Sequence, residues 1–136
     1  MNRPILIAYQ LLIALSDTFT GAVLIAAPEF ALRLMGLHMP ADAMPFLSFI
    51  GAFVLSVGLA CLYGALVMVR RQNPGRLEAV WLLTAITRAS VAIFVLAQIV
   101  AHTLEAGWLS VALSDGACVL FQAIGMRKGW LAHVAR

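Results

Sequence analysis

Charged residues are scarce in this sequence. Only 11% of its 136 residues are Asp, Glu, Lys or Arg, whereas 63% are hydrophobic. A water-soluble domain carries roughly a quarter charged residues, which it needs to cover its surface. This chain cannot present such a surface to water, so its composition predicts that lipid surrounds it. The length fits one domain, residues 1–136, without room for a separate soluble module.

Cysteine and histidine are also rare, and common catalytic motifs are missing. Cys61 and Cys118 fall inside apolar runs, where a thiol usually packs as a small hydrophobic residue, and two such cysteines make no disulfide framework. Neither HExxH nor CxxC occurs, and no histidine is near Ser114 and Asp115 to complete a Ser-His-Asp relay. The three histidines lie far apart in sequence: His38, His102 and His133. We therefore expect no metal centre among these residues and no encoded cofactor.

Four apolar runs predict transmembrane helices, at residues 5–27, 46–69, 78–101 and 107–126. Each has about 20 residues, which matches a hydrocarbon core of about 30 Å at about 1.5 Å per residue. Arg3 precedes the first run as in a signal peptide, but the run is too long and lacks a small-x-small cleavage site. We interpret it as a retained span. The predicted fold is all-α, a polytopic membrane protein with an antiparallel bundle of four transmembrane helices.

Basic residues are concentrated on one side of this predicted topology. Those before the first span, between the second and third, and after the fourth are Arg3, Arg70, Arg71, Arg76, Arg127, Lys128 and Arg136. The connections 28–45 and 102–106 contain only Arg33. The positive-inside rule therefore predicts cytoplasmic N- and C-termini, with Trp81 and Trp130 at the inner interface and Trp108 at the outer one. The net charge of +3 is explained in this way, so we expect no nucleic-acid partner.

The first outer connection is the longest. Pro28 and Glu29 predict the start of a short helix and Gly36 predicts its end. Its apolar residues would let this helix lie along the membrane interface. It could cap a cavity that opens outward, but an ordinary re-entry loop is the simpler interpretation.

Three ionisable residues, Asp17, Arg88 and Asp115, interrupt the apolar runs. A charge at that depth costs roughly 2.5–3.5 kcal/mol on insertion scales unless it finds a partner. The helix rise places them about 18, 15 and 18 Å from the inner side, so all three reach nearly the same level. We therefore predict that they meet inside the bundle.

The helical period supports this prediction. In the third span one stripe contains Thr84, Arg88, Val91, Val95, Gln98 and His102, and in the fourth span one contains Trp108, Val111, Asp115, Cys118, Gln122 and Gly125. Both stripes carry the strongly polar side chains of their spans, so they should face the bundle interior. The second span has no charge, and its small-xxx-small row of Ser56, Ala60 and Gly64 predicts a packing wall.

The predicted site combines a guanidinium with two acids. A guanidinium has five donors and can hold two carboxylates, which makes Asp17 and Asp115 candidates for proton transfer because the ionised set would carry one excess negative charge. The other candidate ligand-binding residues are Thr84, Thr87, Ser114 and Gln122, with Thr18 as a further hydrogen-bonding group. A buried ion network that only fixes helix register is the equally weighted alternative.

The layout of the chain resembles that of the DoxX-like group of small bacterial membrane proteins. The shared features are four short spans, a basic start, and a first span that ends in Ala27-Pro28-Glu29 and is followed by Gly36. The resemblance implies a bacterial inner membrane location and a quinone or another apolar ligand, since some members belong to quinone-reducing complexes. The second span lacks the arginine expected of that group, so no functional residue is transferred.

Three functions follow as hypotheses. The preferred one is an intramembrane polar site that binds an apolar or amphipathic small molecule, quinone-like or lipid-like, with proton-transfer chemistry at an Asp. The second is a small proton-coupled multidrug-type transporter, acting as a homodimer, with Asp17 as the titrating residue. The third is a structural accessory subunit of a larger membrane complex, in which the charges only fix helix register.

Overall fold

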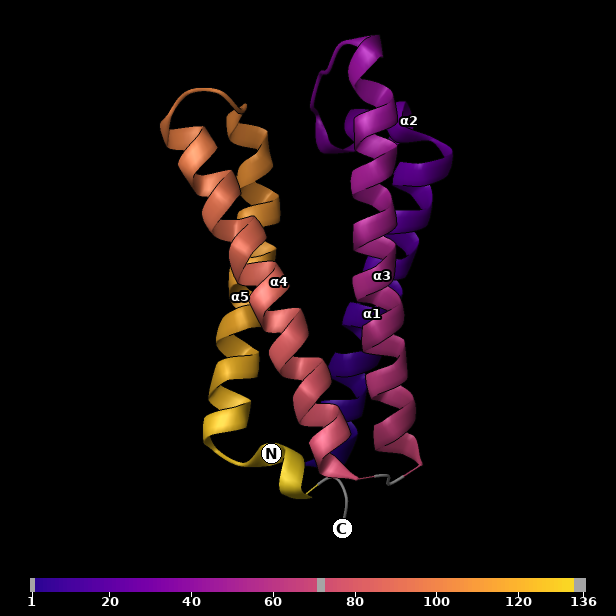
Figure 1. The fold of residues 1–136 in the computed structure, drawn as a ribbon, viewed down its shortest axis with the longest axis vertical. Helices are drawn as coiled ribbons and strands as arrows, with labels where there is room; N and C mark the ends of the chain where they lie inside the picture. The colour runs from indigo at the N-terminus through magenta and orange to yellow at the C-terminus, as the bar shows by residue number, and fades with distance from the viewer. Residues whose placement is uncertain (1, 71–72, 134–136) are drawn as a thin grey trace. The chain divides into compact units, whose positions relative to one another are not determined.

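The protein is helical throughout most of its length. The computed structural model describes residues 2–70 and 73–133, and none of these residues is in a strand (Figure 1). The four long helices are α1 (Arg3–Ala26), α3 (Met44–Val69), α4 (Pro74–Val100) and α5 (Leu109–Arg127). The shorter ones are α2 (Pro28–Met35) and three 3₁₀ turns, η1 (Ala41–Ala43), η2 (Ala106–Trp108) and η3 (Trp130–His133). The all-α prediction is confirmed.

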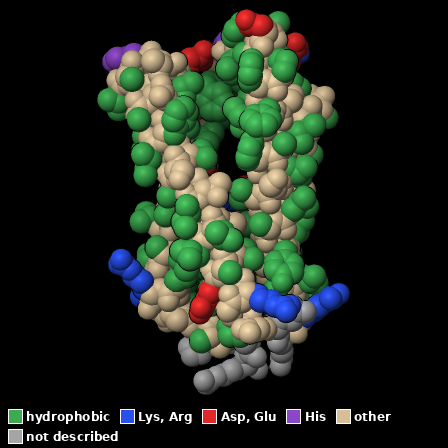
Figure 2. Space-filling model, viewed as in Figure 1, with side chains coloured by type: hydrophobic (Ala, Val, Ile, Leu, Met, Phe, Trp, Pro, Cys, Tyr) green, Lys and Arg blue, Asp and Glu red, His purple; other side chains and the backbone are tan. Residues whose placement is uncertain are grey.

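The four long helices are also long and apolar enough to cross a membrane. They coincide with the four predicted spans and indicate a multi-pass membrane protein. Hydrophobic side chains cover most of the visible length of the helices (Figure 2). The largest boundary difference is at α4, which begins at Pro74 rather than at residue 78. Asn73 caps this helix, since its side chain accepts a hydrogen bond of 2.8 Å from the amide of Gly75.

The helices form two hairpins. The first hairpin contains the described residues up to Val69, and in it α1 packs against α3 in antiparallel fashion, with α2 near their connection (Figure 1). The second hairpin contains the described residues from Arg70 onward, and in it α4 packs against α5. The joining of the two hairpins into one bundle and one domain stays a prediction.

Glycines bring α1 and α3 into close contact. A Cβ on Gly21 would lie 2.4 Å from the backbone nitrogen of Leu55, and one on Gly58 would lie 2.5 Å from that of Thr18. A Cβ on Gly51 would lie 2.7 Å from Leu24. No side chain of any size fits at these three points, so they set the distance between the two helices.

The predicted packing row on α3 is therefore wrong in part. Ser56 is exposed and donates its hydroxyl to the carbonyl of Ala52 at 2.8 Å, whereas Gly64 is buried as expected. Ser56 lies two residues before Gly58, which places it on the opposite side of the helix, because each residue turns the helix by about 100°. Gly51 and Gly58 are seven residues apart and so share the face that meets α1.

The short helix α2 is confirmed within the described residues. It begins at Pro28 and ends before Gly36, whose φ of 68° belongs to the left-handed region that glycine adopts without strain. The amide of Leu37 donates to the carbonyl of Leu32 at 2.9 Å, and the Leu37 side chain is buried. The chain therefore leaves α2 along a defined path toward α3.

Arg3 links α1 to α3 at the open end of the first hairpin, which is the end where α1 begins and α3 finishes. Its Nη2 atom donates to the carbonyl of Met68 at 3.1 Å and to that of Val69 at 3.3 Å, both in the last turn of α3. These carbonyls have no partner within their own helix, and the positive charge also complements the helix dipole. One basic side chain near the N-terminus thus caps a helix that ends 66 residues later.

We expect Arg3→Gln to destabilise the first hairpin by about 1 kcal/mol, because the glutamine amide is shorter and uncharged. Thermal unfolding in a mild detergent, followed by helical circular dichroism, measures the loss. Arg33→Gln is the matched control, since Arg33 is exposed and pairs with the exposed Glu29 at 3.4 Å. Equal unfolding temperatures for the two variants would contradict the capping role.

An aromatic cluster lies at the open end of the second hairpin, where α4 begins and α5 finishes. Phe121 lies between Trp81 and Trp130, with ring centroids 6.1 Å and 5.5 Å away. Gly125 makes room for them, since a Cβ there would lie 2.5 Å from the Trp81 ring. Trp81 is fully buried, and the prediction that it lies at the level of the inner interface stays a prediction. Its ring packs inward against α5.

Candidate functional site

A buried ion pair joins α4 to α5. The Nη1 atom of Arg88 donates to Oδ1 of Asp115 at 2.5 Å. The two side chains are only 7% and 14% exposed. The second hairpin therefore pairs two of the three predicted ionisable residues with each other, and the pair carries no net charge.

The pair lies in the interior of its helices, at least six residues from each helix end. Arg88 is fourteen residues after Pro74 and twelve before Val100, and Asp115 is twelve residues before Arg127. At about 1.5 Å per residue these offsets correspond to roughly 18–21 Å, so a span of this length places both groups near the middle of the hydrocarbon layer. A charge there is strongly disfavoured without a partner, which explains why the two residues meet.

A second polar pair lies one helical turn away on α4. Gln122 Nε2 donates to the hydroxyl oxygen of Thr84 at 3.0 Å, and both residues are buried. The Thr84 hydroxyl in turn donates to the carbonyl of Val80 at 2.8 Å within its own helix. Because Gln122 is two turns after Asp115 on α5, the two polar contacts connect the same pair of helix faces.

The stripes predicted for these helices need correction. On α4 the buried face runs from Thr84 and Arg88 through Ala92 to Val95, while Val91 and His102 are exposed. The step after Arg88 is thus four residues rather than three, and the buried face returns to the predicted stripe at Val95. On α5 the buried residues are Ala112, Cys118, Gln122 and Gly125, so the predicted stripe is largely right at its C-terminal end.

Two of the predicted ligand-binding residues lie on exposed surface. Thr87 donates its hydroxyl to the carbonyl of Leu83 at 3.0 Å, and Ser114 donates to that of Val111 at 3.0 Å. Both side chains are exposed and bond to their own helices. Each is the immediate neighbour of an ion-pair residue in sequence, and a one-residue step of about 100° turns it away from the buried face.

Asp17 belongs to α1, in the first hairpin, and its side chain is partly buried. It is followed by Thr18, where the backbone of α1 meets Gly58 of α3. Asp17 therefore lies on a part of α1 that is in tight contact with its partner helix. The meeting of Asp17 with Arg88 stays a prediction.

Gln10 was not singled out in the sequence, although it is a buried polar residue on α1. It is 1% exposed, and its Nε2 atom donates to the carbonyl of Cys61 on α3 at 2.9 Å. It lies seven residues before Asp17 and so shares a helix face with it. The depth argument applied to charged residues would also have found it, because an amide in an apolar run needs a partner too.

Comparisons with known proteins identify no relative. No family model matches the chain, and no curated protein or solved structure matches it. Within residues 2–70 and 73–133, no group of three or more His, Cys, Asp or Glu residues is placed to hold a metal ion. The fold and the site therefore define a class only, a multi-pass helical membrane protein with a buried Arg–Asp pair.

Proposed function

We propose that the protein binds an amphipathic small molecule inside the membrane, with its polar head at Arg88. The buried Arg88–Asp115 pair carries the proposal. A hairpin can fix its register with apolar residues and glycines alone, as α1 and α3 largely do. An ion pair costs desolvation energy without adding much stability, so its presence in a span favours a functional role.

The chemistry of Arg88 defines the class of ligand. A guanidinium has five donors in one plane, and Nη1 of Arg88 donates to Asp115. Its planar fork suits acceptor oxygens such as a quinone carbonyl or the carboxylate of a lipid-like acid. Asp115 keeps the guanidinium in position, and the Thr84–Gln122 pair adds polar groups on the adjoining turn.

Proton transfer is part of the proposal. An incoming anionic head would compete with Asp115 for Arg88, and a carboxylate released from its partner at this depth takes up a proton. Asp115 is the first candidate for this role and Asp17 is the second. The DoxX-like resemblance supports a quinone as ligand, and any electron transfer would then need a partner protein that supplies the electrons.

The distribution of charge supports an orientation with both termini in the cytoplasm. In each hairpin the basic excess is at the open end, and the connecting end is acidic. The residues at the open ends are Arg3, Arg70, Arg76, Glu78, Arg127 and Lys128, and those at the connecting ends are Glu29, Arg33, Asp42 and Glu105. Both hairpins thus have their basic residues mainly at the open end. The positive-inside rule then favours the cytoplasmic side for both open ends. We place the protein in a bacterial inner membrane on the DoxX-like resemblance.

Native mass spectrometry of the protein purified in mild detergent tests the proposal. We expect a quinone or acidic lipid to co-purify with the wild type, and its occupancy to fall at least about tenfold in the double variant Arg88→Leu/Asp115→Leu. That variant removes both members of the Arg88–Asp115 pair together, so neither is left without the other. Arg3→Gln is the control, because it changes an arginine outside the site and should leave occupancy unchanged.

Two outcomes would overturn the proposal. One is a wild type that retains no small molecule when it is extracted directly from its native membrane. The other is undiminished occupancy in the folded double variant. The pair would then serve only to fix helix register, as in a structural accessory subunit.

A further inference from the structure

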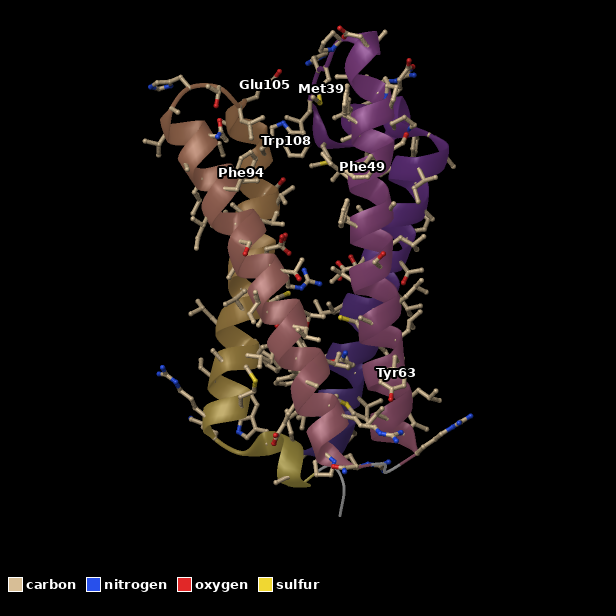
Figure 3. All side chains as sticks on the ribbon, viewed as in Figure 1. Met39, Phe49, Tyr63, Phe94, Glu105 and Trp108 are labelled. Carbon is tan, nitrogen blue, oxygen red and sulfur yellow. The ribbon has the colours of Figure 1, made fainter. Side chains whose placement is uncertain are left out.

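A second candidate site lies at the connecting end of the first hairpin, far along the chain from Arg88. We infer that His38, Met39 and Met44, named here the His–Met cluster, bind a soft monovalent metal ion, Cu(I) or Ag(I). All three residues line one surface depression between α2 and the start of α3. Figure 3 shows Met39 on the loop that leads into α3.

Local structure brings these residues together. The left-handed Gly36 and the buried Leu37 anchor the chain as it leaves α2, and they direct His38 and Met39 into the loop. After Pro40 the 3₁₀ turn η1 reverses the chain, and α3 begins at Met44. Two thioethers and one imidazole, all within a segment of seven residues, thus reach the same depression.

The donor set selects the metal. Thioether sulfur is a soft, neutral ligand that favours Cu(I) and binds Zn²⁺, Mg²⁺ or Ca²⁺ poorly, while imidazole suits copper as well. The depression also contains Glu29 and Arg33, but these two form an ion pair with each other at 3.4 Å. No third His, Cys, Asp or Glu completes a site for a harder ion within the described part of the chain.

Accessibility and charge permit metal entry. His38 is exposed, Met39 is 36% exposed and Met44 is partly buried, so the donors can be reached from solvent. The charged residues between Pro28 and Pro45 are Glu29, Arg33 and Asp42, which sum to one negative charge and favour a cation. By contrast, Cys61 and Cys118 are buried in helices.

Silver titration of the full-length protein in detergent tests this site, because Ag(I) mimics Cu(I) and does not change oxidation state. A background with Cys61→Ala and Cys118→Ala removes thiol binding. We expect native mass spectrometry to show one bound Ag(I) per chain, and the affinity to fall at least about tenfold in Met39→Leu/Met44→Leu and also in His38→Ala. Met→Leu conserves volume, so these variants should fold. Met35→Leu and His102→Ala are the matched controls and should bind as the background does.

A measurement on the unmodified protein gives an independent test. Bound Ag(I) should slow the peroxide oxidation of Met39 and Met44 to their sulfoxides, with Met35 as an internal reference that Ag(I) does not protect. Equal oxidation rates with and without Ag(I) would overturn the inference. So would undiminished Ag(I) binding when all three cluster residues are replaced, or Zn²⁺ binding as tight as that of Ag(I).

Discussion

Replacing Arg88 alone by leucine is expected to destabilise the protein by about 3–5 kcal/mol, because Asp115 would remain in the span without its partner. Asp115→Leu should cost a similar amount, since it removes the Asp115 carboxylate from the Arg88 guanidinium near mid-span. Unfolding in mixed micelles with increasing denaturing detergent, followed by circular dichroism, gives the free energy of unfolding for each variant.

The double variant shows how much of each loss in stability comes from the interaction between Arg88 and Asp115. Arg88→Leu/Asp115→Leu should recover most of the stability lost in the single variants, because an apolar pair fits the lipid environment without desolvation cost. A matched cycle on Thr84→Val and Gln122→Leu should give a much smaller coupling, about 1 kcal/mol, since those groups are neutral. Strictly additive losses at Arg88 and Asp115 would show that the contact contributes no coupling energy.

Gly58→Ala is expected to destabilise the first hairpin by about 2–3 kcal/mol or more. The added methyl group would lie 2.5 Å from the backbone nitrogen of Thr18, and a backbone atom cannot move aside as a flexible side chain can. The helices α1 and α3 would have to separate, which also weakens the Gln10 contact with Cys61. The same unfolding measurement applies.

Gly116→Ala is the matched control on α5. A Cβ at Gly116 meets no atom within 4 Å, and alanine favours a helix over glycine by about 1 kcal/mol. We therefore expect a neutral or stabilising effect at this position. A loss of similar size in both variants would point to a general cost of removing glycine, and would contradict the close-contact explanation for Gly58.

Most of the helical architecture could be predicted from the sequence. Runs of about 20 apolar residues at low charge have few alternatives to membrane-spanning helices, because every backbone polar group must find its partner within the segment. Prolines and glycines marked the ends, so α2 was predicted from Pro28 to Gly36 and is observed there. The predicted level of Arg88 and Asp115 also agrees with their contact, since helix rise converts position into depth.

The contact faces were less predictable. A row of small residues permits close approach wherever it occurs, and the row predicted for α3 was that of Ser56, Ala60 and Gly64. The structure selects Gly51 and Gly58 and leaves Ser56 exposed. The buried face of α4 was also predicted only in part, because Ala92 lies on it and Val91 does not.

Chemistry and spacing alone determine that this chain is a multi-pass helical protein with ionisable groups at mid-span, because hydropathy and helix rise act within one segment. Two contacts depend on how one helix is rotated against another. They are the pairing of Arg88 with Asp115 in the second hairpin and the hydrogen bond from Gln10 to Cys61 in the first. That rotation is set by packing between segments distant in sequence, so only the tertiary structure decides it.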